Sequence, residues 1–449
     1  MVTRLQAPPF DVLAPYLPTR GAAADPETAT AVRAIIEDVR ARGDAAVVDH
    51  ARRLDGVELA PDQWEVSGAR CEEALARLPR ALRAALELAA ARVRAYHEKQ
   101  AAKEGGGFLE RDAQGTTLGM RVVPLERVGV YVPGGKAAYP STVIMNAVPA
   151  RVAGVRELVM ATPPGGAGGG GGTGGVPDVV LAAARLAGVT RVFRVGGAQA
   201  IAALAFGTRT VPRVDKIVGP GNRFVTEAKR QLAGGGIVGI DMLAGPTEVL
   251  VIADEAGDVR AVAADLIAQA EHDEDASAWC VTTSARLADA LPGELARQVA
   301  RSPRRVIVER SLADHGVVVV VPDLDAAVEV ANRRAPEHVE LLVGGDPWPL
   351  VERIRHAGAI FVGGATPEPV GDYVAGPSHV LPTAGTARYV SPLGVYDFVK
   401  RTSVIAYAPQ RLAQDAEHII ALAEAEGLFG HAEAVRIRGE KGDGGGTLR

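Results

Sequence analysis

"VTRVFRVGGAQAIAALAFG", residues 189–207, joins a run rich in β-branched residues to an Ala-rich apolar segment through two glycines. The first part is typical of a buried strand and the last part of a helix, with the glycines at the turn between them. The same order recurs nearby in "RVGVYVPGG" (127–135), "ELVMATPP" (157–164) and "VDKIVGPGN" (214–222). Such alternation predicts a parallel sheet flanked by helices.

A second series of short apolar runs follows the first, with helical segments between most of them. These runs are "TEVLVIAD" (247–254), "SAWCVTTS" (277–284), "RVIVER" (305–310), "GVVVVV" (316–321), "HVELLV" (338–343) and "AIFVGG" (359–364). A chain of 449 residues also exceeds the size at which a single core usually stops growing. We therefore expect two α/β domains in tandem.

The segments around these two series have a different character. Apolar and Ala residues at helical spacing predict helices in residues 26–104, which we interpret as a support or lid, and one or two helices in residues 411–438. The Gly-rich stretch 163–178 is expected to be a mobile loop and residues 439–449 a disordered tail. We assign no chemistry to the loop or the tail.

Composition restricts the partners and the compartment. A net charge of −5 without a long Lys/Arg run gives no electrostatic footprint for nucleic acid, so small molecules are the better expectation. Cys71 and Cys280 have no metal-type spacing and form no disulfide framework, which favours a reducing, cytoplasmic setting. The first residues carry Pro and Asp where a signal peptide needs an apolar stretch, and no apolar run reaches transmembrane length. No membrane association is expected.

Three glycine-containing junctions between strand and helix are candidate nucleotide sites. They are Gly134–Gly135, "VGGAQAIAALAFG" (195–207) and "VGPGNRFVTEAKRQL" (218–232). Glycines after a strand let backbone N–H groups approach a ligand, and the helix N-terminus that follows favours a phosphate. None of the three matches the G-x-G-x-x-G fingerprint of dinucleotide-binding folds, so ordinary tight turns of an α/β fold remain the alternative interpretation.

Polar clusters in the second half of the chain are candidates for metal binding. In "DLIAQAEHDEDASAWC" (265–280), Gln269 and His272 are three residues apart and share a helix face, as two ligands of one ion would, although a solvated helix end looks similar. Asp372 and His379 lie in the Gly/Pro-rich loop "GDYVAGPSHVLPT" (371–383), a common kind of place for function. From ligand chemistry alone, His272, Asp372 and His379 would be the zinc ligands.

Two further pairs of Glu and His are ambiguous. In "APEHVE" (335–340), Glu337 and His338 follow a Pro, as at the start of an ordinary helix, but they could equally be placed to move protons. Glu426 and His431 in "EAEGLFGH" lie on either side of a Gly that ends a helix. Most such pairs are solvated surface.

Taken together, these stretches resemble the histidinol dehydrogenase family from about residue 120 to residue 438. The matching motifs occur in the order and approximate spacing of that family: "GVYVPGGKAAYPSTVIMNAVPA", "VGGAQAIAALAFGT", "DKIVGPGNRFVTEAKR", "DMLAGPTEVLVIAD", "QAEHDEDA", "APEHVE", "GDYVAGPSHVLPTAGTAR" and "EGLFGHAEAV". Each motif alone is weak, but eight in register are specific.

The resemblance implies an NAD-dependent enzyme with one Zn²⁺ per subunit that oxidises L-histidinol to L-histidine via L-histidinaldehyde, the last steps of histidine biosynthesis. It also implies two tandem Rossmann-like, aldehyde-dehydrogenase-like three-layer domains, with an N-terminal helical segment and a C-terminal helical dimerisation tail. The expected division is 1–118 helical segment, 119–245 NAD-binding domain, 246–385 zinc-carrying and catalytic domain, and 386–449 tail. The tail is expected to contribute to the active site of the partner subunit in a homodimer.

Carried over residue by residue, the resemblance assigns roles that the motifs alone leave open. Glu337 and His338 become the proton-transferring pair. The expected zinc ligands are Gln269, His272, Asp372 and His431, the last from the partner subunit, which leaves His379 as a nearby residue that faces the substrate or supports a ligand. The expected NAD contacts are Tyr131, Gln199 and Asn222. The expected substrate contacts are Thr247, Gln269, His272, His338, Asp372, Glu426 and His431.

This sequence departs from the family pattern at a few places. Many family members have Ser at position 247, and Thr247 keeps the hydroxyl but adds a methyl group. The Gly-rich insertion 163–178 and the tail after residue 438 also differ, but neither touches a motif.

Three other functions remain open at this point. A related zinc and NAD enzyme could oxidise another small polyol or amino alcohol, which a substrate panel would reveal, although Glu426 and His431 match the histidinol-specific tail. A zinc hydrolase that uses Glu337 as base would be active without NAD and would have no use for Tyr131, Gln199 and Asn222. A non-catalytic α/β binding protein would form no NADH.

Overall fold

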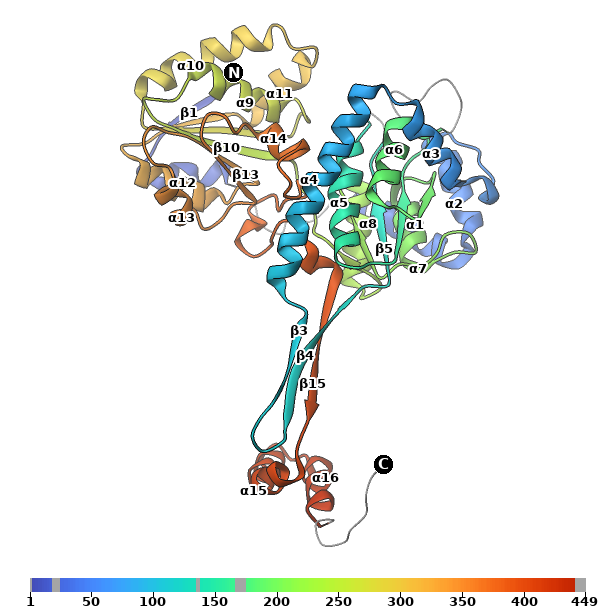
Figure 1. The fold of residues 1–449 in the computed structure, drawn as a ribbon. Helices are drawn as coiled ribbons and strands as arrows, with labels where there is room; N and C mark the ends of the chain where they lie inside the picture. The colour runs from blue at the N-terminus through green and yellow to red at the C-terminus, as the bar shows by residue number, and fades with distance from the viewer. Residues whose placement is uncertain (1, 18–24, 135–137, 166–174, 441–449) are drawn as a thin grey trace. The chain divides into compact units, whose positions relative to one another are not determined.

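Two six-stranded sheets and one three-stranded sheet organise the residues described by the computed structural model, which are 2–17, 25–134, 138–165 and 175–440 (Figure 1). By their contacts these residues form two compact units. The first unit comprises residues 1–101 and 125–398 and contains both six-stranded sheets; the second comprises residues 102–124 and 399–449. The Gly-rich loop and the tail expected from sequence fall mostly outside the described residues.

The first sheet has the strand order β2-β7-β6-β5-β8-β9 and is parallel apart from β2, which pairs antiparallel with β7. The chain moves outward from β5 through β6 to β7 and then returns to the other side of β5 for β8 and β9, so the order reverses between β5 and β8. This is the strand order of Rossmann-like folds. The strands are β2 (Glu65–Val66), β5 (Arg127–Tyr131), β6 (Glu157–Ala161), β7 (Arg191–Phe193), β8 (Lys216–Val218) and β9 (Gly239–Ile240).

Helices cover both faces of the first sheet, because its central strands are apolar on both sides. Val128 and Val130 of β5 pack on one face and Tyr131 on the other, following the two-residue period of a strand. One face is covered by α3 (Gly68–Arg77), α4 (Arg80–Glu104), α5 (Pro140–Val152) and α6 (Asp178–Ala187). The other is covered by α1 (Pro26–Arg42), α2 (Asp44–His50), α7 (Gly197–Phe206) and α8 (Arg223–Gly234).

The second sheet is wholly parallel and has the order β1-β12-β11-β10-β13-β14, so its order also reverses, between β10 and β13. Its strands are β1 (Thr3–Gln6), β10 (Glu248–Ala253), β11 (Ser277–Thr282), β12 (Val317–Val320), β13 (His338–Leu342) and β14 (Ala359–Val362). One face packs on α9 (Val259–Ala270), α10 (Ala285–Val299) and α11 (Arg305–His315), and the other on α12 (Leu324–Arg334) and α13 (Trp348–Arg353). The short helix α14 (Glu368–Tyr373) follows β14.

These two sheets confirm the tandem Rossmann-like α/β architecture, and two local differences have clear causes. The run "RVIVER" (305–310), expected as a strand, begins helix α11, in which Val308 and Leu312 are buried four residues apart. The prediction of a strand at 305–310 was wrong, because these six residues alone are too few to show the helical spacing that continues to Leu312. Strand β1 was not anticipated because its four residues carry too little pattern, and it is fixed by pairing with β12.

The second unit is an antiparallel sheet of order β15-β4-β3 with two helices at one end (Figure 1). Its elements are β3 (Gly107–Arg111), β4 (Thr117–Pro124), β15 (Val399–Ala406), α15 (Pro409–Ala425) and α16 (Phe429–Glu440). The two helices confirm the expected C-terminal helical segment, whereas the sheet was not expected, since all five residues of β3 are exposed and leave no core pattern to read. In the described part of the chain, no helix combines the length and apolar character needed to cross a bilayer.

Candidate active site

A cleft of about 570 Å³ in the first unit is lined by residues from both six-stranded sheets. The first sheet contributes Pro133 and Gly134 after β5 and residues 220–222 after β8, which lie at the carboxyl ends of the strands where the strand order reverses. Ligands of open α/β sheets bind in this crevice. The second sheet contributes the opposite edge, with Thr247 before β10 and Glu337 and His338 at the start of β13.

Glu337 is buried immediately before β13 and is held by two hydrogen bonds. Its Oε2 accepts from the Thr247 hydroxyl at 2.5 Å and from the Glu248 backbone N–H at 2.9 Å. Burial raises the pKa of Glu337 to about 8, and these two hydrogen bonds act in the lowering direction. A buried carboxylate with a pKa near neutrality can accept a proton from water or a ligand.

His338 is also buried, and its backbone environment fixes its tautomer. Its Nδ1 lies 2.9 Å from the backbone carbonyl oxygen of Glu248, which can only accept, so Nδ1 carries the proton. Nε2 is left as a base, 3.9 Å from Oε1 of Glu368. Burial also lowers the pKa of His338, which favours the neutral ring.

The possibility that "APEHVE" is a solvated helix start is therefore wrong. Helix α12 ends at Arg334, Ala335 adopts a left-handed conformation with φ of 50°, and the chain turns directly into buried strand β13. Pairing of His338 with Val249 of β10 and Ala359 of β14 fixes that strand in the sheet. The Pro at position 336 does lie just after the end of helix α12. A Pro does not indicate, however, whether a helix or a strand follows it.

Glu248 supports both members of the pair through its backbone, and its own side chain is anchored. The Glu248 carboxylate accepts from the Ala384 N–H at 2.6 Å and lies 3.3 Å from the buried guanidinium of Arg334. The same guanidinium donates to the Ser277 hydroxyl at 3.0 Å and stacks over the Trp279 ring at 4.9 Å. A buried charge pair with these extra partners holds the start of β10 in place.

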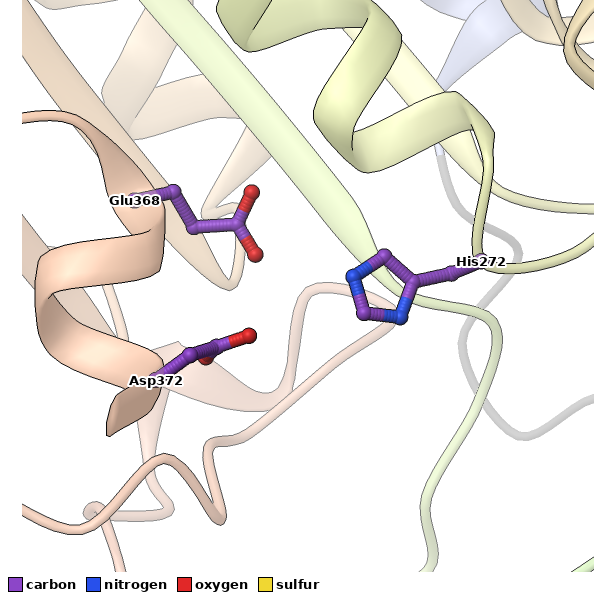
Figure 2. A group of neighbouring side chains, drawn as sticks. All are labelled: His272, Glu368 and Asp372. Carbon is purple, nitrogen blue, oxygen red and sulfur yellow. The ribbon is translucent and has the colours of Figure 1, made fainter. Parts of the chain in front are cut away.

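Potential metal ligands converge beside this pair. His272, Glu368 and Asp372 each offer a ligand atom, and these atoms all lie within 4.8 Å of one another. Figure 2 shows the imidazole of His272, from the loop after α9, directed toward the two carboxylates, both carried by α14. Ligand chemistry alone suggested His272, Asp372 and His379 as the zinc ligands. Among the described His, Cys, Asp and Glu residues, the group that converges contains Glu368 in place of His379.

Gln269 lies at the end of α9 and is fully buried. Its Nε2 donates to the Thr247 hydroxyl at 2.7 Å, which links it through that hydroxyl to Glu337. Its carbonyl oxygen Oε1 is buried without a hydrogen-bond partner among the described residues. An orphaned buried acceptor is costly unless a donor or a cation satisfies it.

Glu368 was missed at the sequence level, although "PEPVGDY" (367–373) places it four residues before Asp372, on the same face of a short helix. Its backbone N–H donates to Oε1 of Glu340 at 2.8 Å, which anchors the first turn of α14. Glu340 also interacts with Asp265, and the two form a buried acidic pair. Burial, followed by the charge of Asp265, raises the pKa of Glu340 to about 9.

The predicted cofactor residues all lie at the carboxyl edge of the first sheet. Tyr131 ends β5 and its hydroxyl accepts from the backbone N–H of Gly197, the first residue of α7, at 3.0 Å. Burial raises the pKa of Tyr131 to about 12. Gln199 is buried in the first turn of α7, and Asn222 caps α8 and lines the cleft.

The remaining predicted residues fall into two places. His379 lines the cleft and two smaller pockets of about 150 Å³ beside it. Glu426 follows α15 and His431 lies in α16, and both are exposed. These two residues belong to the second unit, whereas the other candidates belong to the first.

A buried Glu–His pair, a convergent set of metal-type side chains and a cleft at the switch point of a Rossmann-like sheet define an α/β enzyme. The sequence model of the family "Histidinol dehydrogenase" matches residues 19–439. The histidinol dehydrogenase of Chromobacterium violaceum is 52% identical over 423 residues, covering 94% of both chains. That of Aquifex aeolicus is 49% identical over 424 residues, covering 94% of this chain and 95% of the relative.

A solved structure supports the same relationship. The crystal structure of histidinol dehydrogenase from Elizabethkingia anophelis superimposes with a TM-score of 0.89 at 31% sequence identity and covers 98% of each chain. The chain belongs to the histidinol dehydrogenase family, which is a family of oxidoreductases.

Proposed function

We propose that this enzyme oxidises L-histidinol to L-histidine through L-histidinaldehyde with NAD as hydride acceptor and Zn²⁺ bound, as the last steps of histidine biosynthesis. The observation that carries the proposal is the position of the buried Glu337–His338 pair. The pair shares one cleft with the glycine turns at the reversal point of a Rossmann-like sheet. A proton acceptor and a nucleotide-type crevice in one cleft suit hydride transfer coupled to proton removal.

The NAD would lie along the carboxyl edge of the first sheet, in contact with Tyr131, Gln199 and Asn222. When bound, it would supply the hydride acceptor for both oxidations. The turn that carries Asn222 is well fixed for this purpose. Gly219, with φ of 107°, donates its N–H to Asp241 at 2.8 Å, and its carbonyl accepts from the buried Lys229 ammonium at 3.0 Å.

The residues near His272 fit a zinc ion. One imidazole and a carboxylate are close enough for one ion, and the orphaned carbonyl oxygen of Gln269 is a neutral oxygen donor that needs a partner. We propose Gln269, His272 and Asp372 as ligands, with His431 of a second copy of the chain as the fourth. When bound, the ion would supply a Lewis-acidic template for the nitrogen atoms of the substrate.

In the first oxidation, His338 takes the proton of the substrate hydroxyl as the C–H bond at that carbon breaks and the carbon loses a hydride. The neutral ring with a free Nε2 is the form required, and the Nδ1–H bond to Glu248 maintains it. The product of this step is the aldehyde.

In the second oxidation, Glu337 accepts a proton from a water molecule while the water oxygen adds to the aldehyde carbon. His338 again removes a hydroxyl proton as the resulting diol loses a hydride, and the carboxylic acid is formed. A thiol is a poor alternative nucleophile, because burial raises the pKa of Cys280 to about 12 and Cys71 is buried in α3. Both cysteines are free, which supports the cytoplasmic location that we also propose.

The substrate would contact Thr247, Gln269, His272, His338 and Asp372 from one subunit and Glu426 and His431 from its partner in a homodimer. The second unit has features that support pairing with another copy, since it exposes many large apolar side chains. They include Phe108, Leu109, Leu118, Ile405, Leu422 and Phe429.

The test of this function is NADH formation from L-histidinol, followed by absorbance, with and without a chelator. We expect activity with NAD that is lost on metal removal and restored by Zn²⁺. A panel of other amino alcohols and polyols should react much more slowly. Product formation without NAD, or full activity after verified metal removal, would contradict the proposal.

Sharing of sites between subunits predicts complementation. His431→Asn and His338→Asn variants should each be nearly inactive alone, because one lacks the donated ligand and the other the base. Mixed under conditions of subunit exchange, they should regain up to roughly a quarter of the parental activity, since half of the randomly formed dimers contain one intact site. Failure to regain activity, with hybrid dimers verified by mass spectrometry, would rule out the shared site.

A further inference from the structure

Asp55 lies in a part of the chain to which sequence reasoning assigned no chemistry. It ends a π-helical turn, Ala51–Asp55, that continues from α2, and it is exposed. Single π-helical turns occur frequently at functional sites. The Oδ2 atom of Asp55 accepts a hydrogen bond from Nε2 of Gln199 at 2.9 Å. A carboxylate from the N-terminal segment therefore reaches the carboxyl edge of the first sheet.

The side-chain amide of Gln199, which donates to Asp55, has a carbonyl oxygen without a hydrogen-bond partner among the described residues. Gln199 is only 1% exposed, and its Oε1 has no hydrogen-bond partner among the described residues. The nearby Gly197 N–H is already used by the Tyr131 hydroxyl. Gln199 thus has a buried acceptor that lacks a donor among the described residues, and it is bonded to the exposed carboxylate of Asp55.

We propose that Asp55 and Gln199 together bind the ribose hydroxyls of the dinucleotide and select NAD over its 2′-phosphorylated form. This inference rests on the NAD dependence proposed above and adds a specificity-determining residue to it. Two neighbouring acceptors, one charged, match the two O–H donors of a vicinal diol, and a carboxylate is the group that reads the ribose 2′-hydroxyl in Rossmann-type sites. A 2′-phosphate would bring negative charge and no donor to the same place, so it would be repelled.

The experiment compares NAD and NADP as substrates of the full-length holoenzyme and of Asp55→Asn. We expect kcat/KM for NAD to fall roughly tenfold or more, because a charge-assisted hydrogen bond is lost, through KM rather than kcat. The value of kcat/KM for NADP should stay unchanged or rise, so the preference for NAD over NADP should narrow by roughly tenfold or more. Asp55→Glu retains the charge and should keep most of the preference. Asp62→Asn, which removes an exposed carboxylate further along the chain, is the matched control and should change neither value.

Three outcomes would overturn the inference. One is an unchanged NAD to NADP ratio in Asp55→Asn, and another is an equal loss with both cofactors, which would indicate a purely structural role. The third concerns the adenine amino group, which also offers two donors. If Asp55→Asn abolishes a preference for NAD over deamino-NAD while leaving discrimination against NADP intact, the carboxylate reads the base and not the ribose. Failure of the underlying function is distinguishable, since the unaltered enzyme would then form no NADH with any of these cofactors.

Discussion

Replacing His338 with Asn is expected to slow the oxidation of L-histidinol to the aldehyde by roughly 10²–10⁴-fold, the usual contribution of a positioned general base. Asn can still donate to the Glu248 carbonyl in place of Nδ1, but it offers no base where Nε2 lies. Single-turnover NADH formation with L-histidinol measures this step. The oxidation of supplied L-histidinaldehyde should also slow, since the diol must lose a hydroxyl proton as well.

The matched control for this variant is His315→Asn, which makes the same substitution at the end of α11, outside the residues that line the cleft. Its rates should equal those of the parent. A His338→Asn variant that bound NADH and substrate normally and oxidised L-histidinol at more than a tenth of the parental rate would exclude His338 as the base.

Replacing Glu337 with Gln should separate the two oxidations. Gln can still accept from the Thr247 hydroxyl and the Glu248 N–H, so the local structure is kept, but it cannot remove a proton from water. We expect measurable oxidation of L-histidinol, loss of aldehyde oxidation by roughly 100-fold or more, and an NADH yield that approaches half of the parental yield per L-histidinol consumed. Equal loss of both half-reactions in the Glu337 and His338 variants would refute this division of roles.

The folding of the Glu337→Gln variant can be checked through the pH dependence of its stability. The pKa of Glu337 is raised in the folded protein from an ordinary value of 4.5 to about 8, so the folded state binds a proton that the unfolded state has lost. Stability from this group is fully present below the lower value and decreases as pH rises toward the higher one. Gln removes this dependence, so the melting temperature of the variant should match the parent near pH 5 and exceed it near pH 8. A variant less stable than the parent at both values would show disrupted packing instead.

The fold was predictable because its signals are local. In residues 189–207 the change from a β-branched run through glycines to an Ala-rich segment gives β7 and α7, and the same alternation gives the other central strands of both sheets. Strand β1 was not predicted, because its four residues are too few to show a pattern. Helix α11 was wrongly predicted as a strand, because its first six residues were interpreted without the residues that follow them. The family resemblance named most of the candidate site, while ligand chemistry alone chose His379 and overlooked Glu368.

By itself, the sequence determined which segments are strands and helices, because the two-residue and 3.6-residue periods come from the backbone and are visible among neighbouring residues. Only the tertiary structure decided which polar side chains meet. Glu248 and His338 are 90 residues apart and Asp55 and Gln199 are 144 residues apart, yet each pair is in hydrogen-bond contact. Such contacts depend on the strand order and on the points where that order reverses in the two sheets. They cannot be predicted from the spacing of apolar residues within one strand or helix. For the same reason Asp55, in a segment without any motif, became a candidate for function only once the first sheet was folded.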